Sequence, residues 1–494
     1  MYVTVVVISN IFEQARQTPG KIAAVSNGVA CNYGNFARLI EVSRQYFAQQ
    51  ALPVDSVAVI DVDSLLDAWI LGLALRSLGL TTCATKDAAE IAKLGIQNIG
   101  CIVTAEADNR PRPGHPSAAF PWRLIRVPAN LKLSAMQGPV PALPEAMAHP
   151  GGHIMMTSGT TGVHKKVVRD AAMEALAIPL HAEINGISAQ SAVYVANFGL
   201  WTAGGYRWPL ITWSMGGTVV FHQEIDLHSP LARHDMTHIF TTPATLAALL
   251  AASKGAPRRN DATRLLVTGG VLSRSMLATA KQLLTRQVYS VLASTEALTL
   301  AVTPLDQPDD LLWHRIHPSR EVQVVDEAGS VLGPWREGFV RVRIIDGLSG
   351  YLNDEVATRE FFHDEYFYPG DLGMFGGDGR LALRGRASDV INVLGDKIAT
   401  DPIERVLQDR LGAEGVCILP IQNTEGEDEI HLVIQRGRPL ERAELEAAKS
   451  AVLGVIKSVS VRVAVVEKLP RNEMGKIKRL ELKRQLTRAR NASS

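Results

Sequence analysis

A loop rich in glycine and hydroxylated side chains occupies residues 155–166, MMTSGTTGVHKK. Its small residues leave backbone N–H groups open to a ligand, and its serine and threonines add hydroxyl donors. This combination suits a phosphate chain, although two residues separate Gly162 from Lys165 and the Walker pattern is therefore absent. By itself the stretch fits a solvated loop tip equally well.

A second segment, LASTEA at 292–297, places a hydroxyl beside a carboxylate after an apolar, strand-like run. Beside a phosphate loop, such a pair is suited to a nucleotide and its magnesium ion, because Mg²⁺ prefers oxygen ligands. A helix start capped by Ser294 or Thr295 would give the same letters. The segment alone leaves both readings open.

Charged residues also frame two segments nearer the C-terminus. Asp371 and Arg386 bracket a glycine turn in 368–391, and a hairpin folded back between them would bring both to one ligand. A carboxylate that accepts two hydrogen bonds is a common partner of a ribose diol. In LPRNEMGKIKR at 469–479, Gly475 leaves Lys476 unhindered, whereas the neighbouring basic residues fit a solvated helix face.

Composition limits the classes of protein that can carry these motifs. At 494 residues the chain predicts two or more domains. Its 51 basic and 50 acidic side chains give a net charge of +1, which does not indicate a general nucleic-acid or anionic-membrane surface. The four cysteines, Cys31, Cys83, Cys101 and Cys417, are widely spaced and indicate a reducing, cytoplasmic setting without a metal framework.

The elements that must position the motifs alternate between strand-like and helical stretches. This alternation predicts α/β architecture with much parallel sheet. We expect strands in SVAVIDVD, GCIVTAEAD, HIMMTS, AVYVAN, GTVVFHQ, HIFTTP and RLLVTGG. A β-rich subdomain is expected from about residue 320, and a compact α+β domain of about a hundred residues closes the chain.

Three apolar or proline-rich stretches need separate interpretation. The first residues, MYVTVVVISNIF, predict a strand rather than a signal peptide, since no basic region or cleavage site accompanies them. The stretch 65–80 is interrupted by Asp67 and Arg76, so it predicts a buried helix rather than a membrane span. Prolines between 111 and 150 predict a surface excursion.

Together and in this order, the four motifs resemble those of the adenylate-forming superfamily, which contains acyl- and aryl-CoA synthetases, peptide-synthetase adenylation domains and luciferase. The resemblance runs from about Ile11 to Leu486. It implies a large N-terminal domain over 1–385, with α/β layers and a β-rich subdomain. A small mobile α+β domain over 386–494 would carry the catalytic lysine, with the hinge at Ser388.

The resemblance also implies roles for single residues. Thr295 would contact the α-phosphate, Glu296 the Mg²⁺, and Asp371, with Arg386 beside it, the ribose. Lys476 would bridge the reacting carboxylate and the α-phosphate, and Gly395 would line the thiol tunnel after domain rotation. The other ATP contacts would come from Thr157, Ser158, Gly159, Thr160, Thr161, Gly162, Lys165, Leu292, Ala293 and Ser294.

The sequence departs from the family's pattern at four places. His164, Lys165 and Lys166 replace Pro-Lys-Gly, and Leu292-Ala293 replaces the aromatic residue and glycine near adenine. Pro369 replaces a threonine, and Ser388 replaces the usual hinge residue. We expect weaker adenine stacking and a differently tuned rotation. No charge that the chemistry requires is lost.

The acyl pocket is assigned by spacing within the family. Trp201 falls at an aromatic or histidine gate, unless it is ordinary core packing. Ala203 falls where amino-acid-activating relatives place an aspartate, and without that acid a buried ammonium would be unpaired. Amino-acid substrates are therefore disfavoured, and an aryl or medium-chain acid is expected. The opposite wall would be Gly269, Gly270 and Val271.

The resemblance therefore implies an ATP- and Mg²⁺-dependent carboxylate–CoA ligase. Transfer to a carrier-protein phosphopantetheine is the alternative, and a degenerate nucleotide-binding protein is a third reading. Basic groups available near the expected active site for a CoA phosphate are Lys165, Lys166, Arg169 and the C-terminal lysines. The pair His234 and His238 lacks a third metal ligand, so a surface or capping role is expected for it.

Overall fold

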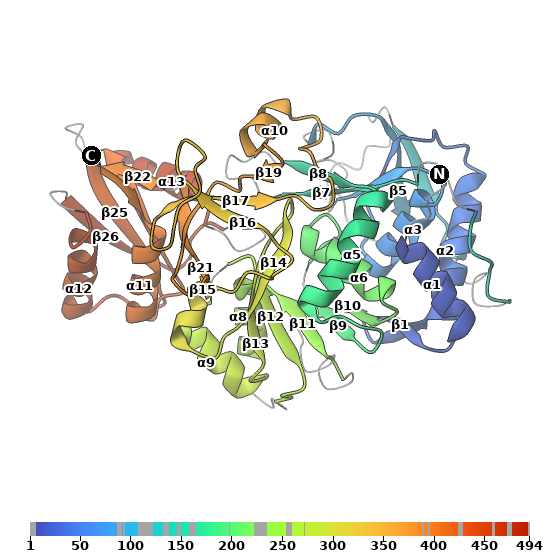
Figure 1. The fold of residues 1–494 in the computed structure, drawn as a ribbon, viewed down its shortest axis with the longest axis horizontal. Helices are drawn as coiled ribbons and strands as arrows, with labels where there is room; N and C mark the ends of the chain where they lie inside the picture. The colour runs from blue at the N-terminus through green and yellow to red at the C-terminus, as the bar shows by residue number, and fades with distance from the viewer. Residues whose placement is uncertain are drawn as a thin grey trace.

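The structure is a computed structural model of the chain. It describes residues 6–85, 91, 94–106, 122–131, 138–145, 150–157, 165–196, 198–221, 235–252, 259–270, 272–387, 390–393, 396–422, 428–456, 460–471 and 477–492. Figure 1 shows the N-terminal helices at one end of the long axis, a β-rich sheet in the middle and a C-terminal unit at the other end. This mixed α/β arrangement confirms the predicted fold class.

A six-stranded sheet supports the phosphate-loop segment. Its order is β6-β5-β3-β4-β7-β8, parallel except for the last pair. The strands are β3 (Val57–Ile60), β4 (Thr81–Ala84), β5 (Ile99–Ala105), β6 (Arg123–Val127), β7 (His153–Met156) and β8 (Lys166–Arg169). The antiparallel β7–β8 pair turns the chain back at the quoted loop. β6 is an edge strand, which fits its place within the proline-rich stretch.

A second, eight-stranded sheet has the order β14-β13-β12-β11-β9-β10-β1-β2. All of its pairs are parallel except those at its two ends. The strands are β1 (Ile22–Ser26), β2 (Val29–Asn32), β9 (Ala192–Val195), β10 (Thr218–Phe221), β11 (His238–Thr241), β12 (Arg264–Thr268), β13 (Val288–Ser294) and β14 (Leu298–Pro304). The seven strands predicted from 57 to 268 are thereby confirmed.

Helices enclose the two sheets, and one large core contains residues from both sheets and their helices. The helices of this region are α1 (Val6–Gln17), α2 (Tyr33–Ala48), α3 (Leu65–Arg76), α5 (Ala171–Asn185), α6 (Ala203–Ser214), α8 (Pro243–Ala252) and α9 (Arg274–Leu283). Arg76 of α3 is buried in an ion pair of 2.8 Å with Glu174 of α5. The predicted buried helix at 65–80 is confirmed, and no helix among the described residues is long and apolar enough to cross a membrane.

A β-rich sheet follows from residue 313, as expected. Its strands are β15 (Trp313–His314), β16 (Val322–Val325), β17 (Gly338–Arg343), β18 (Phe362–His363), β19 (Tyr366–Phe367), β20 (Asp371–Phe375) and β21 (Leu381–Arg386), with the short helices η2 (Pro308–Leu311) and α10 (Glu355–Phe361). Their pairings are antiparallel. This sheet carries the Asp371 and Arg386 motif.

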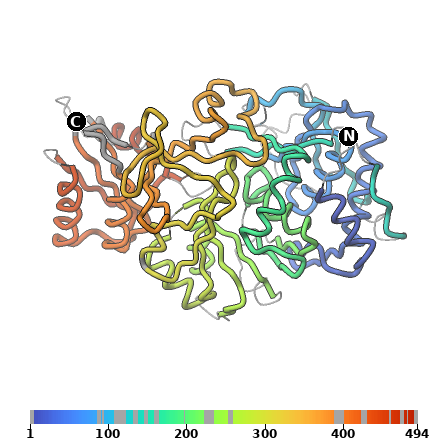
Figure 2. Tube along the Cα trace, in the orientation of Figure 1, coloured from blue at the N-terminus to red at the C-terminus, as the bar shows by residue number. Residues whose placement is uncertain are grey.

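The C-terminal unit forms a lobe with its own apolar core, at the end opposite the blue N-terminal helices in Figure 2. It consists of β22 (Val390–Val393), β23 (Asp396–Ala399), α11 (Asp401–Leu411), β24 (Gly415–Gln422), β25 (Asp428–Gln435), α12 (Arg442–Leu453), β26 (Ser460–Val466) and α13 (Arg479–Ala492). The α+β expectation is confirmed. The domain boundary at 385/386 stays a prediction.

Two local predictions are wrong. The N-terminal run predicted as a strand contributes helix α1, because Val7, Ile8, Ile11 and Phe12 recur at helical spacing and are buried. The β-branched residues obscured that periodicity. His238, expected at a surface or cap, lies in strand β11 and is buried. His234 lies outside the described residues.

Buried histidines make stability depend on pH. Burial lowers the pKa of His153 to about 3 and those of His238 and His314 to about 4. Unfolded histidine titrates near pH 6.5, so between pH 6.5 and 4 the unfolded chain binds protons that the folded chain does not. The free energy of unfolding should therefore decrease as the pH is lowered through this window, with a slope that approaches about 1.4 kcal/mol per pH unit for each histidine. Thermal melting at pH 7 and 5 tests this. A His238→Gln variant should show a shallower fall, and an unchanged melting temperature in the native protein would contradict the assignment.

Candidate functional site

Six of the predicted site residues follow strands at one edge of the eight-stranded sheet. Strands β9, β12 and β13 run parallel, so their carboxyl ends meet at the same edge. Trp201 and Ala203 follow β9, Gly269 and Gly270 follow β12, and Thr295 and Glu296 follow β13. The predicted acyl pocket and the Thr-Glu motif therefore share the edge where open α/β sheets bind ligands.

The ends of the phosphate loop are fixed beside this edge. The N–H of Thr157 donates to the carbonyl of Lys165 at 2.8 Å, and the N–H of Met156 donates to the carbonyl of Trp201 at 2.8 Å. The base of the loop is thus tied to the segment that contains Trp201, where the acyl pocket is predicted. Five predicted phosphate contacts, together with His164, lie outside the described residues: Ser158, Gly159, Thr160, Thr161 and Gly162.

Lys165 points into a mixed aromatic and acidic environment. Its ammonium lies 3.3 Å from the ring centroid of Phe361 and 5.1 Å from that of Tyr351. Burial lowers the pKa of Lys165, while the nearby carboxylates of Glu360 and Glu296 oppose that shift. Arg386 lowers this pKa further. The side chains of the loop lysine, the Thr-Glu motif and the hairpin arginine are therefore close enough to influence one another.

The other two basic residues expected near CoA are engaged elsewhere. The buried Lys166 ammonium donates to the carbonyl of Leu94 at 2.8 Å. The guanidinium of Arg169 is buried in an ion pair of 2.5 Å with Asp346. Lys166, where the family usually has glycine, thus links the β7–β8 pair to a neighbouring segment. Neither side chain is available at a tunnel mouth.

The Thr-Glu motif forms a tight turn between β13 and β14 rather than a helix start. Ser294 does cap locally, since its hydroxyl oxygen accepts the N–H of Ala297 at 2.8 Å. The buried carboxylate of Glu296 accepts the Tyr351 hydroxyl at 2.7 Å through Oε1. Among the described residues, no hydrogen bond is recorded at its Oε2, which leaves an oxygen suited to a cation.

The strand leading into this turn contains the two residues expected near adenine. Leu292 and Ala293 are half-buried in β13, and the pairing with β14 shifts register between them. Such a bulge redirects side chains at the end of a strand. The irregularity coincides with the position where the family's aromatic residue and glycine are replaced.

The hairpin prediction for Asp371 and Arg386 is confirmed. The two residues face each other across β20 and β21, and Arg386 Nε lies 2.9 Å from Asp371 Oδ1. Arg386 Nη1 also donates to the carbonyl of Pro369 at 2.6 Å. Proline at 369 still supplies this acceptor, because only its backbone oxygen is used. The carboxylate and guanidinium are partly exposed, as a ligand-facing pair must be.

The lysine loop lies outside the described residues, but its flanks are well defined. Arg471 and Ile477 form an isolated bridge, and the N–H of Lys478 donates to the carbonyl of Pro470 at 2.8 Å. Arg479 then forks onto both carboxylate oxygens of Glu404, at 2.8 and 2.7 Å. These contacts fix both ends of the segment that contains Lys476. Ser388, Gly395 and Val271 also lie outside the described residues.

Trp201 is half-buried at the predicted acyl pocket. Its indole covers Gly199, where an added Cβ would lie 2.2 Å from Trp201 Cη2. The small residue at 199 therefore makes room for the ring.

We expect Trp201→Ala to shift kcat/KM toward longer acids, because removing the ring lengthens the pocket. An acid-panel assay measures this preference. If Trp201 is only a core residue, the variant should instead melt at a lower temperature and keep the same acid preference. Its free energy of unfolding should then fall by no more than roughly 3–5 kcal/mol. Thermal melting beside the panel separates these results.

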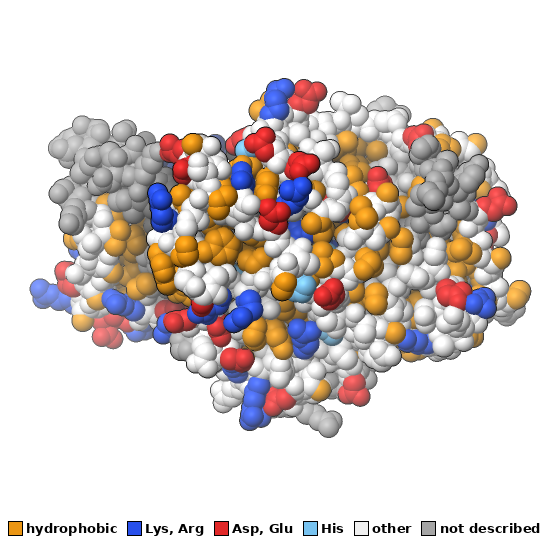
Figure 3. All heavy atoms as spheres, in the orientation of Figure 1, with side chains coloured by type: hydrophobic (Ala, Val, Ile, Leu, Met, Phe, Trp, Pro, Cys, Tyr) orange, Lys and Arg blue, Asp and Glu red, His pale blue; other side chains and the backbone are white. Residues whose placement is uncertain are grey.

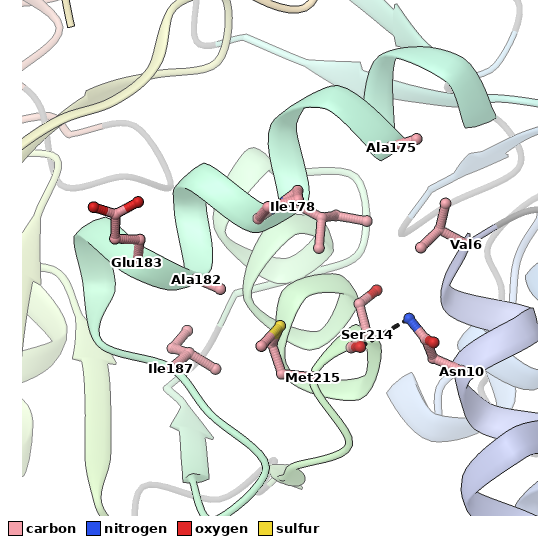
Figure 4. Close-up of a pocket in the computed structure, with 10 residues that line it drawn as sticks. Val6, Asn10, Ala175, Ile178, Ala182, Glu183, Ile187, Ser214 and Met215 are labelled. Carbon is pink, nitrogen blue, oxygen red and sulfur yellow. Dashed lines mark hydrogen bonds between the residues drawn. The ribbon is translucent and has the colours of Figure 1, made fainter. Parts of the chain in front are cut away.

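A cavity of about 400 Å³ lies away from these residues, between α1, α5 and the end of α6 (Figure 4). Its walls are mainly apolar, with Ile178, Ile187 and Met215 among them. Asn10 Nδ2 donates to the carbonyl of Ser214 at 2.8 Å on its floor. None of the predicted site residues lines it.

Several functional candidates escaped the sequence analysis. Tyr351 contacts Glu296 from a distant segment, and the buried Arg207 and Arg320 hold the backbone of the Thr-Glu turn. Arg169, which the sequence suggested for a CoA phosphate, holds the same turn instead. Each is an isolated letter in the sequence and acquires its partner only through tertiary packing. The one sign in the sequence that could have identified them was a charged residue within an otherwise apolar segment, such as Arg207 in α6.

Comparison with known proteins agrees with this geometry. A family model described as AMP-binding enzyme matches residues 11–352. Pyochelin synthase PchD of Pseudomonas aeruginosa is 28% identical over 349 residues, covering 67% of this chain and 63% of that protein, so the match spans less than two thirds of its length. A 4-chlorobenzoate–CoA ligase of Arthrobacter is 22% identical over 503 residues, covering 96% and 94%.

Solved structures share the fold. The anthranilate CoA ligase AuaEII in complex with anthranoyl-AMP has a TM-score of 0.84 at 14% identity, covering 99% of this chain and 98% of that one. ATP-bound MatB from Rhodopseudomonas palustris has a TM-score of 0.80 at 18% identity, covering 97% and 98%. Because the family model matches well over half of the chain, this protein belongs to the AMP-binding enzymes of the adenylate-forming superfamily.

Proposed function

We propose that the protein activates a carboxylic acid with ATP and transfers the resulting acyl group to the thiol of CoA. The observation that carries this proposal is that Lys165 and Glu296 share Tyr351, whose ring centroid lies 5.1 Å from the Lys165 ammonium and whose hydroxyl donates to Glu296 at 2.7 Å, while Arg386 lies near enough to lower the pKa of Lys165. Lys165, Glu296 and Arg386 come from three motifs far apart in the sequence. Lys165 lies beside β8, Glu296 after β13 and Arg386 in β21, so the fold brings a cation, an acid and a ribose-type pair together from three different sheets.

The first half-reaction joins two anions, so the residues must offset charge repulsion. The substrate carboxylate would attack the α-phosphorus of ATP, giving an acyl-adenylate and pyrophosphate. Lys165 and the loop hydroxyls would hold the departing phosphates, while Thr295 orients the α-phosphate. Asp371 and Arg386 would hold the ribose. Mg²⁺ bound at Glu296 would supply further neutralisation of phosphate charge.

The second half-reaction requires the lysine segment to move away. In the proposal, Lys476 serves adenylate formation from the C-terminal unit, over 386–494. Rotation at Ser388 then brings Gly395 to the thiol path, and thiol attack releases AMP. The Glu404–Arg479 fork supports such a motion, because it ties the lysine segment to α11 as one unit.

The acid is proposed to be aromatic or of medium chain length. Ala203, at the first position of α6, offers no carboxylate for an α-ammonium. Among the described residues other than its chain neighbours, Pro243 lies nearest to the place of the missing side chain of Gly270, at 3.2 Å. A neutral wall with small residues suits a flat or extended apolar acid better than an amino acid.

The acceptor is the less constrained half of the proposal. Lys166 and Arg169 do not support a CoA phosphate site, since both are buried in other contacts. On the face shown in Figure 3, acidic and basic side chains are interspersed, without a broad surface of one sign. CoA remains the proposed acceptor because one relative in sequence and one neighbour in fold, both matched over nearly their full length, are CoA ligases. Similarity to a pyochelin synthase favours a carrier protein as the second candidate.

The purified protein should be incubated with MgATP, CoA and a panel of aryl and medium-chain acids. Acyl-CoA detected by mass spectrometry is the expected product. Adenylate that accumulates with CoA and discharges only onto a phosphopantetheinylated carrier would replace CoA by the carrier as acceptor.

A further inference from the structure

Three arginines hold the backbone of the Thr-Glu turn from one side. Arg207 Nη2 donates to the carbonyl of Ser294 at 3.0 Å, and Arg169 donates to the carbonyls of Thr295 and Glu296, each at 2.8 Å. Arg320 Nη2 donates to the carbonyl of Ala297 at 2.7 Å. Four consecutive carbonyls are thereby fixed by side chains from three separate segments: α6, β8 and the loop before β16.

This arrangement takes three cationic side chains out of water. All three guanidinium groups belong to buried residues, and Asp346 is paired directly with Arg169. The buried carboxylates of Asp346 and Glu296 both favour the charge on Arg207. Burial, followed by the like charge of Arg169, lowers the pKa of Arg207 to about 9. Removing a cation from water costs several kcal/mol unless its hydrogen bonds are well satisfied. Arg207 is therefore a buried cation whose hydrogen bond is made to the backbone of the turn.

The fixed carbonyls determine how the motif side chains are presented. A peptide plane whose carbonyl is held cannot rotate freely, so the adjoining Cα–Cβ directions are fixed as well. On the other side of the turn, Tyr351 restrains the carboxylate of Glu296. The arginines act on backbone and Tyr351 acts on a side chain, and together they preorganise the motif.

Arg207 also connects the turn to the predicted acyl pocket. It is the only charged residue in α6, and it lies one helical turn after Ala203, the residue with which α6 begins. Residues four apart lie on the same side of a helix. A shift of α6 near Ala203 would therefore also move Arg207 and, through its hydrogen bond, the carbonyl of Ser294.

We propose that Arg207 is a positioning residue through which occupancy of the acyl pocket changes the affinity of the Thr-Glu turn for MgATP. This proposal rests on the proposed function, since it takes Ala203 as a pocket residue. By linkage, the effect is reciprocal: the acid tightens nucleotide binding by the same factor as the nucleotide tightens acid binding. Arg207 itself touches neither substrate.

The test measures binding of Mg²⁺ with α,β-methylene ATP by calorimetry, in wild type and Arg207→Lys. Lysine keeps the charge but lacks the planar fork. We expect roughly 10-fold weaker binding without any acid, the scale of one charge-assisted hydrogen bond. The panel acid that best supports pyrophosphate release should tighten wild-type binding at least about 5-fold, and this tightening should shrink toward one in the variant.

Arg264→Lys is the matched control, because Arg264 Nη1 also donates to a backbone carbonyl, that of Asn185 at 2.8 Å. It should lower thermal stability without altering nucleotide binding. Arg169→Lys provides a second perturbation of the same turn and should also weaken nucleotide binding. If the folded Arg207→Lys protein binds nucleotide like wild type and keeps the acid effect, the positioning role is wrong. Failure of wild type to bind nucleotide at all would instead count against the proposed function.

Discussion

Lys476→Ala is expected to abolish adenylate formation while largely sparing thioester formation from a supplied acyl-adenylate. The lysine serves only the conformation used in the first half-reaction, where its charge bridges the carboxylate and the α-phosphate. Removal of a preorganised charge of this kind costs roughly 10²–10³-fold in rate. Single-turnover pyrophosphate release measures the first step, and AMP release from synthetic acyl-adenylate with CoA measures the second.

A neighbouring lysine provides the control for this experiment. Lys478 is half exposed, and its ammonium lies 3.6 Å from Glu481. Exposed pairs of this kind contribute little to stability, so Lys478→Ala should leave both steps near wild type. Equal losses in both steps for Lys476→Ala would show that the lysine supports the structure instead of the first reaction.

Glu296→Gln should weaken the use of MgATP far more than the binding of acid. The amide keeps the shape of the side chain and can still accept the Tyr351 hydroxyl, but it removes the negative charge that a magnesium ion requires. We expect roughly 10²-fold lower kcat/KM for MgATP, and a higher Mg²⁺ concentration for half-maximal rate. Steady-state rates measured across a magnesium titration test both effects.

Glu355→Gln offers a matched change of charge away from the motif, since the Glu355 side chain is 90% exposed and lies 3.8 Å from Arg359. It should leave magnesium dependence unchanged. If Glu296→Gln also retains the wild-type magnesium dependence, Glu296 does not contact the metal.

Local sequence patterns predicted much of the fold because they reflect burial of continuous segments. The parallel strands from Val57 to Thr268 are short apolar runs, and the Asp371–Arg386 hairpin follows from a glycine turn between alternating residues. The same reasoning failed at Val6–Gln17, where β-branched residues masked a helical periodicity. Burial of one face of this segment against the rest of the protein favours the helix.

The site was predictable only where its residues form a motif. Thr295, Glu296, Asp371 and Arg386 lie in recognisable strings, whereas Arg207 acquires its meaning from a turn nearly ninety residues later. Lys166 shows the opposite case. It follows the predicted phosphate loop in the sequence and was expected near CoA, but its ammonium donates to the carbonyl of Leu94. The spacing of residues in the sequence does not show which way a single side chain points. That orientation decides whether a basic residue such as Lys166 faces the site.

A first-half-reaction assay tests most directly whether the protein converts ATP and an acid into acyl-adenylate and pyrophosphate. The protein at high concentration should be mixed with MgATP and each acid of the panel, without CoA, and the quenched mixture analysed for acyl-adenylate by mass spectrometry. We expect one pyrophosphate and one bound acyl-adenylate per active site with the preferred aryl or medium-chain acid, and neither with Lys476→Ala. ATP cleavage to ADP and phosphate, or no nucleotide turnover with any acid while MgATP still binds, would contradict this expectation.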